Sequence, residues 1–327
     1  MTKQELKQFT DKRTNLIESL IDLMGDRIKK NQKAVLERIL ENFVEKLDTD
    51  ENGKVINNDK NRKLLFQIDD AFKEYRKKEA VETIQLLLKS INKIMTFNQQ
   101  YFTAMEGKAA VLPIMPKVKE FMKQWLGIKG DVAEPNGYIE RLVQSDAAKI
   151  ALKNTAMKIV IGQEGFENAL TQVRELVNKN NFMFGEFGNH ARSFTYDLYS
   201  QIDRATADVV RNDLKLSFAI YEGGIIKTSR LFCEEHEGHV YHVSEIMQFD
   251  PKEAKPPNYN PLTDLGGYNC RHHLNWISNV MAKSLRPDAQ YFIDGTAEEK
   301  DIKPPLNSID EIEKERKKRG FNEQTDF

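Results

Sequence analysis

The chain has 327 residues, of which 40% are hydrophobic and 30% charged, and this composition excludes a disordered or fibrous protein. The length allows two or three globular parts, because domains usually contain about 100–200 residues. The 49 basic and 50 acidic residues leave a formal charge of -1, which argues against the large single-sign field of a general nucleic-acid coat protein.

No segment predicts export or membrane insertion. The first residues are polar and lack the apolar core of a signal peptide, and the longest apolar stretch, 109–115, is far shorter than a membrane span and contains Pro113. We therefore expect a soluble protein that is not secreted and has no membrane partner. Its 2 cysteines do not make a disulfide framework, so they are inert, a metal pair or a single bridge.

Apolar residues recur at helical spacing over the first hundred residues, with charged residues between them. One such series is Leu16, Leu20, Met24 and Ile28. The pattern resumes after the polar residues 48–60. These stripes predict amphipathic helices that bury one face in a bundle or in long hairpins.

The composition and the hydrophobic pattern of the sequence change after the first hundred residues. Frequent Gly and Pro predict a connector that holds a short helix over 118–126. Helices are expected at about 138–160 and 165–178, and short strands at 218–226 and 238–243. The predicted fold is mainly α with a small C-terminal α+β module. The expected regions are a helical N-terminal region (1–106), the connector (107–137), a helical lead-in (138–217), the Cys/His-containing α+β module (218–294) and a charged C-terminal tail (295–327).

Both cysteines and five of the six histidines lie between Cys233 and His273. Zinc prefers four ligands in a tetrahedron, and Cys233 with His236 and Cys270 with His272 or His273 would supply a close pair from each of two loops. A zinc ion bound by both loops would hold them together and so stabilise a small β-rich unit. Cys-x-x-His is a usual chelating pair, whereas Cys-x-His is less common. In the alternative interpretation, the cysteines pack in the core or bridge to one another and the histidines are polar surface residues.

A polar segment between two helical patterns matches part of a calcium-binding loop. Asp48, Asp50 and Asn52 occupy its first, third and fifth places, and Gly53 its sixth. Asp59 stands at the twelfth place, where a bidentate glutamate is usual, and the chain has no second loop of this kind. The same residues suit an ordinary β-turn in which Gly53 supplies the positive φ, and we prefer this interpretation.

Catalytic motifs are not evident in the sequence. His190, Ser193 and Asp197 lie close together along the chain, but a nucleophilic triad requires convergence in space. The sequence has neither a nucleophile elbow nor a phosphate-binding glycine loop. We therefore expect that the protein is not an enzyme.

Four short elements follow one another in the last third of the chain. They are Tyr221-Glu222-Gly223-Gly224, Thr228-Ser229-Arg230-Leu231-Phe232-Cys233, Gly238-His239-Val240-Tyr241 and Gly266-Gly267-Tyr268-Asn269-Cys270-Arg271-His272. In order and spacing, this set resembles the C-terminal region of the phage Mu F-like head-morphogenesis family, which includes minor capsid proteins of tailed bacteriophages. The resemblance is specific over about 60 residues.

The resemblance implies a minor capsid or head-morphogenesis protein, associated with the portal vertex or the capsid interior. Its role would lie in procapsid assembly or in DNA packaging and ejection. The implied location is the virion, and the host cytoplasm during assembly. The implied partners are the portal protein, a scaffold or major capsid protein and the packaged DNA, with an oligomer at the portal.

Two other functions are kept as alternatives. A zinc-dependent nuclease or peptidase would need an open metal position and a general base, and a metal held by four protein ligands would count against it. A DNA-binding module would use Lys314–Arg319, the one dense basic run in the sequence. Such a run is more often a solvated helix face.

Overall fold

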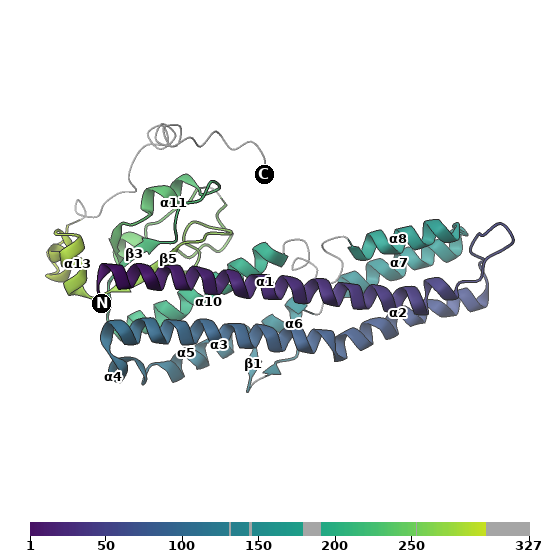
Figure 1. The fold of residues 1–327 in the computed structure, drawn as a ribbon, viewed down its shortest axis with the longest axis horizontal. Coiled ribbons are helices and arrows are strands. Elements are labelled where there is room, and N and C mark those ends of the chain that lie inside the picture. The colour runs from purple at the N-terminus through teal and green to yellow at the C-terminus, as the bar shows by residue number, and fades with distance from the viewer. Residues whose placement is uncertain (131, 144–145, 179–190, 253, 299–327) are drawn as a thin grey trace. The chain divides into compact units, whose positions relative to one another are not determined.

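The computed structural model describes residues 1–130, 132–143, 146–178, 191–252 and 254–298 (Figure 1). The α-helices are α1 (Lys3–Asn42), α2 (Asp59–Lys77), α3 (Glu79–Glu106), α4 (Lys108–Val111), α5 (Met115–Leu126), α6 (Tyr138–Val143), α7 (Asp146–Gly162), α8 (Phe166–Asn178), α10 (Ala191–Asp213), α11 (Leu231–His236), α12 (Val243–Ile246), α13 (Asn279–Leu285) and α14 (Ala289–Ile293). A 3-10 helix, η1, spans Val44–Lys46. The strands are β1 (Ile128–Lys129), β2 (Val132–Ala133), β3 (Phe218–Glu222), β4 (Val240–His242) and β5 (His273–Ile277).

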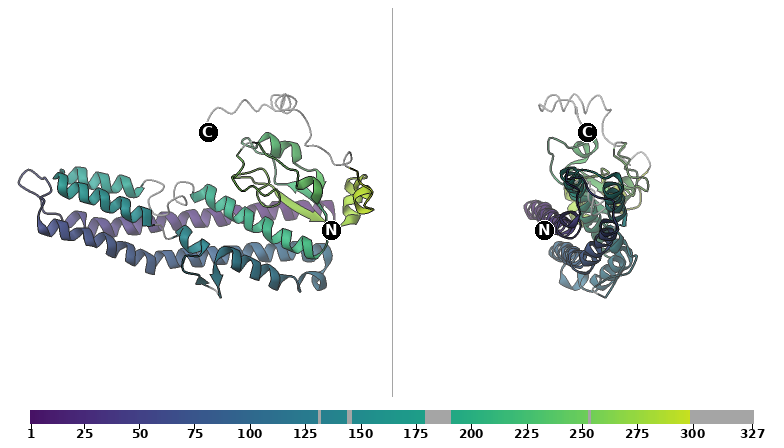
Figure 2. Two further views of the ribbon diagram at one scale, coloured as in Figure 1. Left: turned by 180° about the vertical axis from the view of Figure 1, so that it is seen from behind. Right: turned by 90° about the vertical axis from the view of Figure 1, so that its right-hand side faces the viewer.

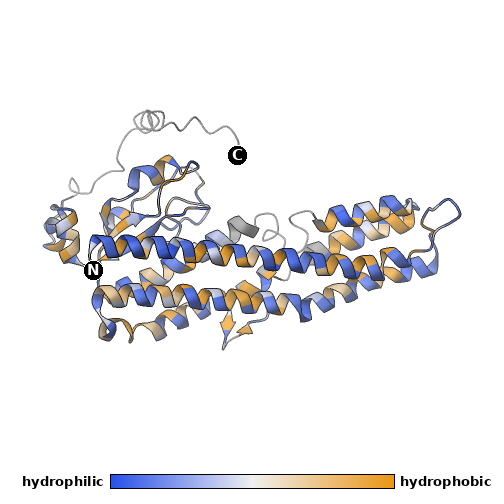
Figure 3. Ribbon diagram, in the orientation of Figure 1, coloured by the Kyte–Doolittle hydropathy of each residue, from blue (hydrophilic) through white to orange (hydrophobic). Residues whose placement is uncertain are grey.

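This architecture confirms the predicted fold class, a mainly α protein with a small sheet module. Apolar and polar residues alternate along α1 and α3 (Figure 3), as the helical spacing of the sequence predicted. None of the helices in the described part of the chain combines the length and the apolar character that a bilayer span requires.

The described residues form two compact units, each made of segments that are distant in sequence. Unit 1 comprises Met1–Ser19, Ile91–Met122 and Tyr196–Phe327 as far as it is described, and unit 2 comprises Leu20–Ser90 and Lys123–Thr195. The five consecutive regions expected from the sequence stay a prediction, and segments from several of them contribute to each unit.

Unit 2 is built mainly from helices that pack side by side. α2 packs on α7, and α7 packs on α8. Within this unit, Arg38 of α1 forms an ion pair with Glu79 at the start of α3, and the Asn31 side chain donates a hydrogen bond of 2.8 Å to Thr83 Oγ1. These contacts satisfy polar groups beside an apolar core, so that burial of the core does not leave them unpaired.

Unit 1 contains a three-stranded antiparallel sheet with the strand order β4-β3-β5. Phe218 pairs with His242 on one side and with Ile277 on the other, which fixes the register. α10 lies against this sheet in both views (Figures 1 and 2), and the guanidinium of Arg211 stacks over the Trp276 ring at 4.7 Å. α10 therefore packs alongside β5, which is an edge strand of the sheet.

The sequence did not predict β5, because polar and apolar residues mix within it. All five of its residues are buried. His273 Nδ1 lies 3.0 Å from Asp203 Oδ2, and the Asn275 amide donates to Thr10 Oγ1 and to Glu222 Oε2, each at 2.7 Å. A strand with one wet face would expose such polar side chains, whereas β5 buries them because partners on α1, α10 and β3 satisfy them.

A buried charge network surrounds β5 within unit 1. Arg13 and Asp203 are both almost fully buried, with 3.5 Å between Nε and Oδ1. Arg13 also donates to Asn275, and the Asn98 amide donates to Asp203 Oδ1 at 2.7 Å. Burial of a lone charge is costly, so each of these groups depends on the others for its place in the core.

Several element boundaries differ from those expected. The expected helix over 138–160 consists of α6 and α7, and residues 144–145 between them lie outside the described set. The connector helix begins at Met115 rather than 118, and α8 agrees with the helix expected at 165–178. Of the expected tail, residues 299–327, including Lys314–Arg319, fall outside the described residues.

Candidate metal centre

The first part of the site is the loop that leads into α11. The Ile226 N–H donates to Ser229 Oγ and the Ser229 N–H donates to the Ile226 carbonyl, each at 2.9 Å, and this closes a turn just before the helix. α11 follows and carries Cys233 at its middle, with only 3% of the side chain exposed. The turn and the helix together hold this thiol inside unit 1.

The second part is the loop that precedes β5, and two arginines fix it. The guanidinium of Arg204, on α10, donates to the carbonyls of Cys270 at 2.6 Å and His272 at 2.8 Å. Arg230, just before α11, donates to the Gly266 carbonyl at 3.0 Å. Five N–H groups in a rigid fork allow one arginine to hold several carbonyls, so the loop is fixed without regular secondary structure.

Two glycines allow the parts of the site to approach closely. A Cβ at Gly266 would lie 2.5 Å from Cys233 Sγ and 3.1 Å from Cys270 Sγ. A Cβ at Gly223, just after β3, would lie 2.5 Å from the Cα of His272. Real Cβ atoms do not come so close to other atoms, so both positions require glycine for steric reasons.

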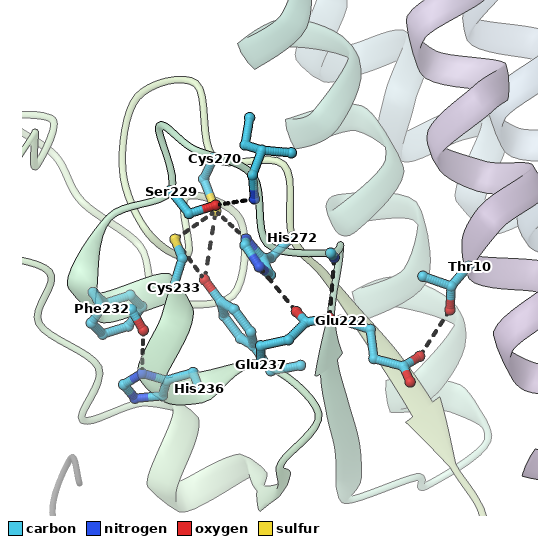
Figure 4. A network of polar contacts seen from close by, with 12 residues as sticks. Thr10, Glu222, Ser229, Phe232, Cys233, His236, Glu237, Cys270 and His272 are labelled. Atoms are coloured by element: carbon cyan, nitrogen blue, oxygen red, sulfur yellow. Dashed lines mark hydrogen bonds and ion pairs between the residues drawn. The ribbon is translucent and has the colours of Figure 1, made fainter. Parts of the chain in front are cut away.

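Cys233, Cys270 and His272 converge on one point, and we call them the thiol–histidine cluster (Figure 4). The two sulfur atoms are 3.8 Å apart, and Cys270 Sγ lies 3.9 Å from His272 Nδ1. The cysteines are free thiols. Zinc–sulfur bonds of about 2.3 Å in a tetrahedron place two sulfurs about 3.8 Å apart, so the thiols already have the separation that a zinc ion requires.

The outer nitrogen of the histidine faces a carboxylate. His272 Nε2 lies 3.0 Å from Glu237 Oε2, as an ion-pair contact rather than an aligned hydrogen bond. Metal-binding histidines almost always direct their second ring nitrogen to a carboxylate or a carbonyl, which fixes the ring and raises its basicity. The cluster therefore has the surroundings of a metal site as well as its ligands.

Tyr221 on β3 packs beside the same cluster. Its ring stacks on the His272 ring with centroids 4.8 Å apart, and its hydroxyl donates to Cys233 Sγ at 3.4 Å and lies 3.6 Å from Cys270 Sγ. Burial raises the pKa of Tyr221 well above its usual value, so this hydroxyl stays protonated and acts as a donor to sulfur.

The three members of the cluster shift one another's pKa values. Burial opposes ionisation of Cys270, but the thiol of Cys233 and the ring of His272 outweigh it and hold the pKa of Cys270 well below its usual range. Cys270, together with burial, raises the pKa of Cys233. Burial disfavours a charged His272, yet Cys270 and Glu237 raise its pKa to about 9. A cation bound by both sulfurs and the ring would displace the remaining protons, so its affinity must depend on pH.

All three members of the cluster line one cavity of about 210 Å³. The other lining residues are Ile226, Thr228, Ser229, Arg230, Asn269 and Arg271. The cavity therefore lies between the turn before α11 and the loop before β5, and no acidic residue is among its described lining residues.

His236 was predicted as a zinc ligand but does not belong to the cluster. Its Nδ1 lies 2.6 Å from the Phe232 carbonyl, and its ring stacks on Phe232 and packs edge-on against Phe249. Burial lowers its pKa to about 4, so the ring is neutral and belongs to an aromatic core. His273, the alternative partner of Cys270, contacts Asp203 instead. The structure therefore does not bring His236 to the point where Cys233, Cys270 and His272 meet.

The calcium-like segment forms the turn that we preferred from the sequence. Asp50 Oδ1 accepts the N–H groups of Asn52 and Lys54, each at 2.9 Å, and the ion pair of Asp48 with Lys60 and that of Asp59 with Arg62 use the remaining carboxylates. Gly53 has φ 73°, as expected for the turn. In the described part of the chain, the carboxylates of Asp48, Asp50 and Asp59 form no group that could hold a metal, because each has a different partner, and Asn52 contributes its backbone N–H to the turn.

Of the remaining sequence candidates, Asp197 is the one whose side chain is described, and its Oδ1 accepts the Asn269 N–H at 2.5 Å. His190 and the side chain of Ser193 fall outside the described residues. Sequence reasoning missed Tyr221, Glu237 and Gly266 as neighbours of the thiol–histidine cluster, since no spacing rule connects them to the cysteines. No family model, curated protein or solved structure matches this chain.

Proposed function

We propose that the thiol–histidine cluster binds zinc and thereby joins α11 to the loop before β5. The observation that carries this proposal is the separation of 3.8 Å between two free sulfurs beside an imidazole nitrogen. Thiolate and imidazole ligands select zinc over calcium or magnesium, which prefer oxygen. A metal at this point would stabilise a sheet of only three strands, because binding to the folded state alone adds its free energy to folding.

We further propose that the protein is a minor head protein of a tailed bacteriophage, acting at the portal vertex or in the capsid interior. The support is that sequence elements of the Mu F-like resemblance meet at one place. Tyr221 and Gly223 come from the first element, Cys233 ends the second, and Gly266 and His272 belong to the last. These elements serve one structural unit, which is what a shared motif requires.

In this role the zinc is structural and the partners are the portal, a scaffold or major capsid protein, or packaged DNA. The cavity beside the cluster keeps a zinc-dependent hydrolase as the second candidate, since three protein ligands leave one position to a water. However, no carboxylate or free histidine lines the cavity in the described residues, so a general base is missing there. The structural role is therefore the better proposal.

Elemental analysis of the purified full chain tests the zinc proposal. We expect one zinc per chain in the wild type and none in a Cys233→Ser, Cys270→Ser double variant. A matched control is His236→Gln, which changes a neighbouring histidine outside the cluster and should retain zinc. A wild-type protein without zinc after expression in zinc-containing medium would overturn the proposal.

Deletion of the coding sequence from a phage that carries it tests the biological role. We expect particles with defective heads or unpackaged DNA by electron microscopy, and rescue by the wild-type protein supplied in trans. The double cysteine variant should rescue poorly. An unchanged yield of infectious particles after deletion would contradict the role in head assembly.

A further inference from the structure

The thiol–histidine cluster supplies three ligand atoms, whereas zinc usually takes four. No fourth Cys, His, Asp or Glu joins the cluster in the described residues. The Tyr221 hydroxyl is near both sulfurs, but Tyr221 does not line the cavity that the three ligands share. Cys233, Cys270 and His272 all do line it, so one side of the ligand triangle faces this space.

We propose that the fourth coordination position of the metal opens into this cavity and is filled by a small oxyanion group, a phosphate or a single carboxylate. The inference rests on the proposed zinc site and adds an exchangeable ligand to it. A closed structural site, in contrast, would use a fourth protein ligand and exclude anions from the solvent.

The charge of the cavity wall favours an anion. Two thiolates and a neutral imidazole would leave the zinc complex without net charge, and the other two charged residues among the described lining of the cavity, Arg230 and Arg271, are both positive. Arg271 Nε is buried and has no hydrogen-bond partner. An anionic oxygen would satisfy this donor while it binds the metal, and hydrogen bonds between charged groups are the strong ones.

The volume of the cavity limits the size of the ligand. Sites for drug-sized molecules enclose about 300–1,000 Å³. The space here is about 210 Å³, shared with hydroxyl and amide groups of Thr228, Ser229 and Asn269. It therefore suits a phosphate or carboxylate group and is too small for a nucleotide.

Glu18 on α1 competes with the anion for the same arginine. Its carboxylate forms an ion pair with the guanidinium of Arg271 and already neutralises part of that charge. If the anion is recognised by Arg271, loss of Glu18 should strengthen binding, and loss of Arg271 should weaken it. Changes of opposite sign at the two ends of one ion pair are not expected from a general effect on folding.

The experiment uses the full chain with cobalt(II) in place of zinc, because cobalt–thiolate charge-transfer bands report the sulfurs and the d–d bands report the fourth ligand. Inorganic phosphate and acetate are titrated separately. We expect a saturable change in the d–d bands with at least one of them, and the responding anion distinguishes a phosphate from a carboxylate ligand. Arg271→Gln should weaken binding by roughly tenfold and Glu18→Gln should tighten it.

The control variant is Lys255→Gln, which also removes one positive charge and one ion pair, that with Asp250, but does not line the cavity. It should bind the anion like the wild type. If the charge-transfer bands never form, the zinc site itself is wrong. If they form and neither anion alters the d–d bands, the metal site stands and the open position is refuted. Equal binding by all variants would overturn recognition by Arg271.

Discussion

Replacing Gly266 by alanine should disrupt the thiol–histidine cluster, although alanine suits the backbone conformation at this position. The added Cβ would lie 2.5 Å from Cys233 Sγ, 3.1 Å from Cys270 Sγ and 3.4 Å from the Tyr221 hydroxyl. Gly266 does not have a positive φ, so alanine fits the local backbone and only the contacts change. Cys233 lies on α11 and Cys270 lies in the same loop as Gly266, and the methyl group must therefore push α11 away from this loop.

The expected cost follows from overpacking. Forcing a methyl group into a filled core costs about 1–3 kcal/mol. A shift of one sulfur by a few tenths of an ångström also moves it away from the 3.8 Å separation that suits a zinc ion. We therefore expect the free energy of unfolding to fall by about 2 kcal/mol and zinc affinity to fall by at least tenfold.

Urea unfolding and zinc competition with a chelator measure these two effects. Gly25→Ala in α1 is the matched control, because a Cβ there meets nothing within 4 Å. Alanine in a helix interior stabilises by about 0.5–1 kcal/mol relative to glycine, so this control should be neutral or more stable. Wild-type zinc affinity and wild-type stability in the Gly266 variant would refute the packing of the two thiols against Gly266.

Three further changes test the surroundings of the cluster and the two units. Glu237→Gln keeps the shape but removes the carboxylate behind the histidine ligand, and zinc affinity should fall by about 10- to 100-fold in chelator competition. Burial opposes ionisation of Asp203, but the charge of Arg13 outweighs it and lowers the pKa of Asp203 to about 2. The stability that this carboxylate contributes is complete above about pH 4 and is lost as the pH falls towards 2, so Asp203→Asn should flatten the acid limb of a stability–pH profile. In unit 2, Asn61→Ala should lower the free energy of unfolding by roughly 2–4 kcal/mol, because its fully buried side chain bonds three backbone groups of the turn before α2.

Each of these expectations has an outcome that would contradict it. Unchanged zinc affinity in the Glu237 variant would mean that the carboxylate does not support the ligand. If the stability of the Asp203 variant falls with decreasing pH as steeply as that of the wild type, a group other than Asp203 causes the loss of stability in acid. Wild-type stability in the Asn61 variant would show that water replaces the three bonds, and Asn57→Ala, on an exposed side chain in the same turn, provides the comparison.

The helical part of the fold was predictable from local pattern. Stripes such as Leu20, Met24 and Ile28 recur at the helical period, and the structure buries all three in α1. β5 was not predictable in this way, because His273 and Asn275 look like surface residues. Their partners lie on α1, α10 and β3, and no short window of sequence contains them.

The sequence by itself determined that the protein is mainly helical, that its cysteines lie in the small C-terminal module, and that Asp50 and Gly53 form a turn. These properties depend on neighbours along the chain. Only the tertiary structure decided that His272 rather than His236 joins Cys233 and Cys270, and that Glu237 and Gly266 complete the site. The physical reason is that a metal site depends on distances between side chains, and packing of α11, β3 and the loop before β5 sets those distances.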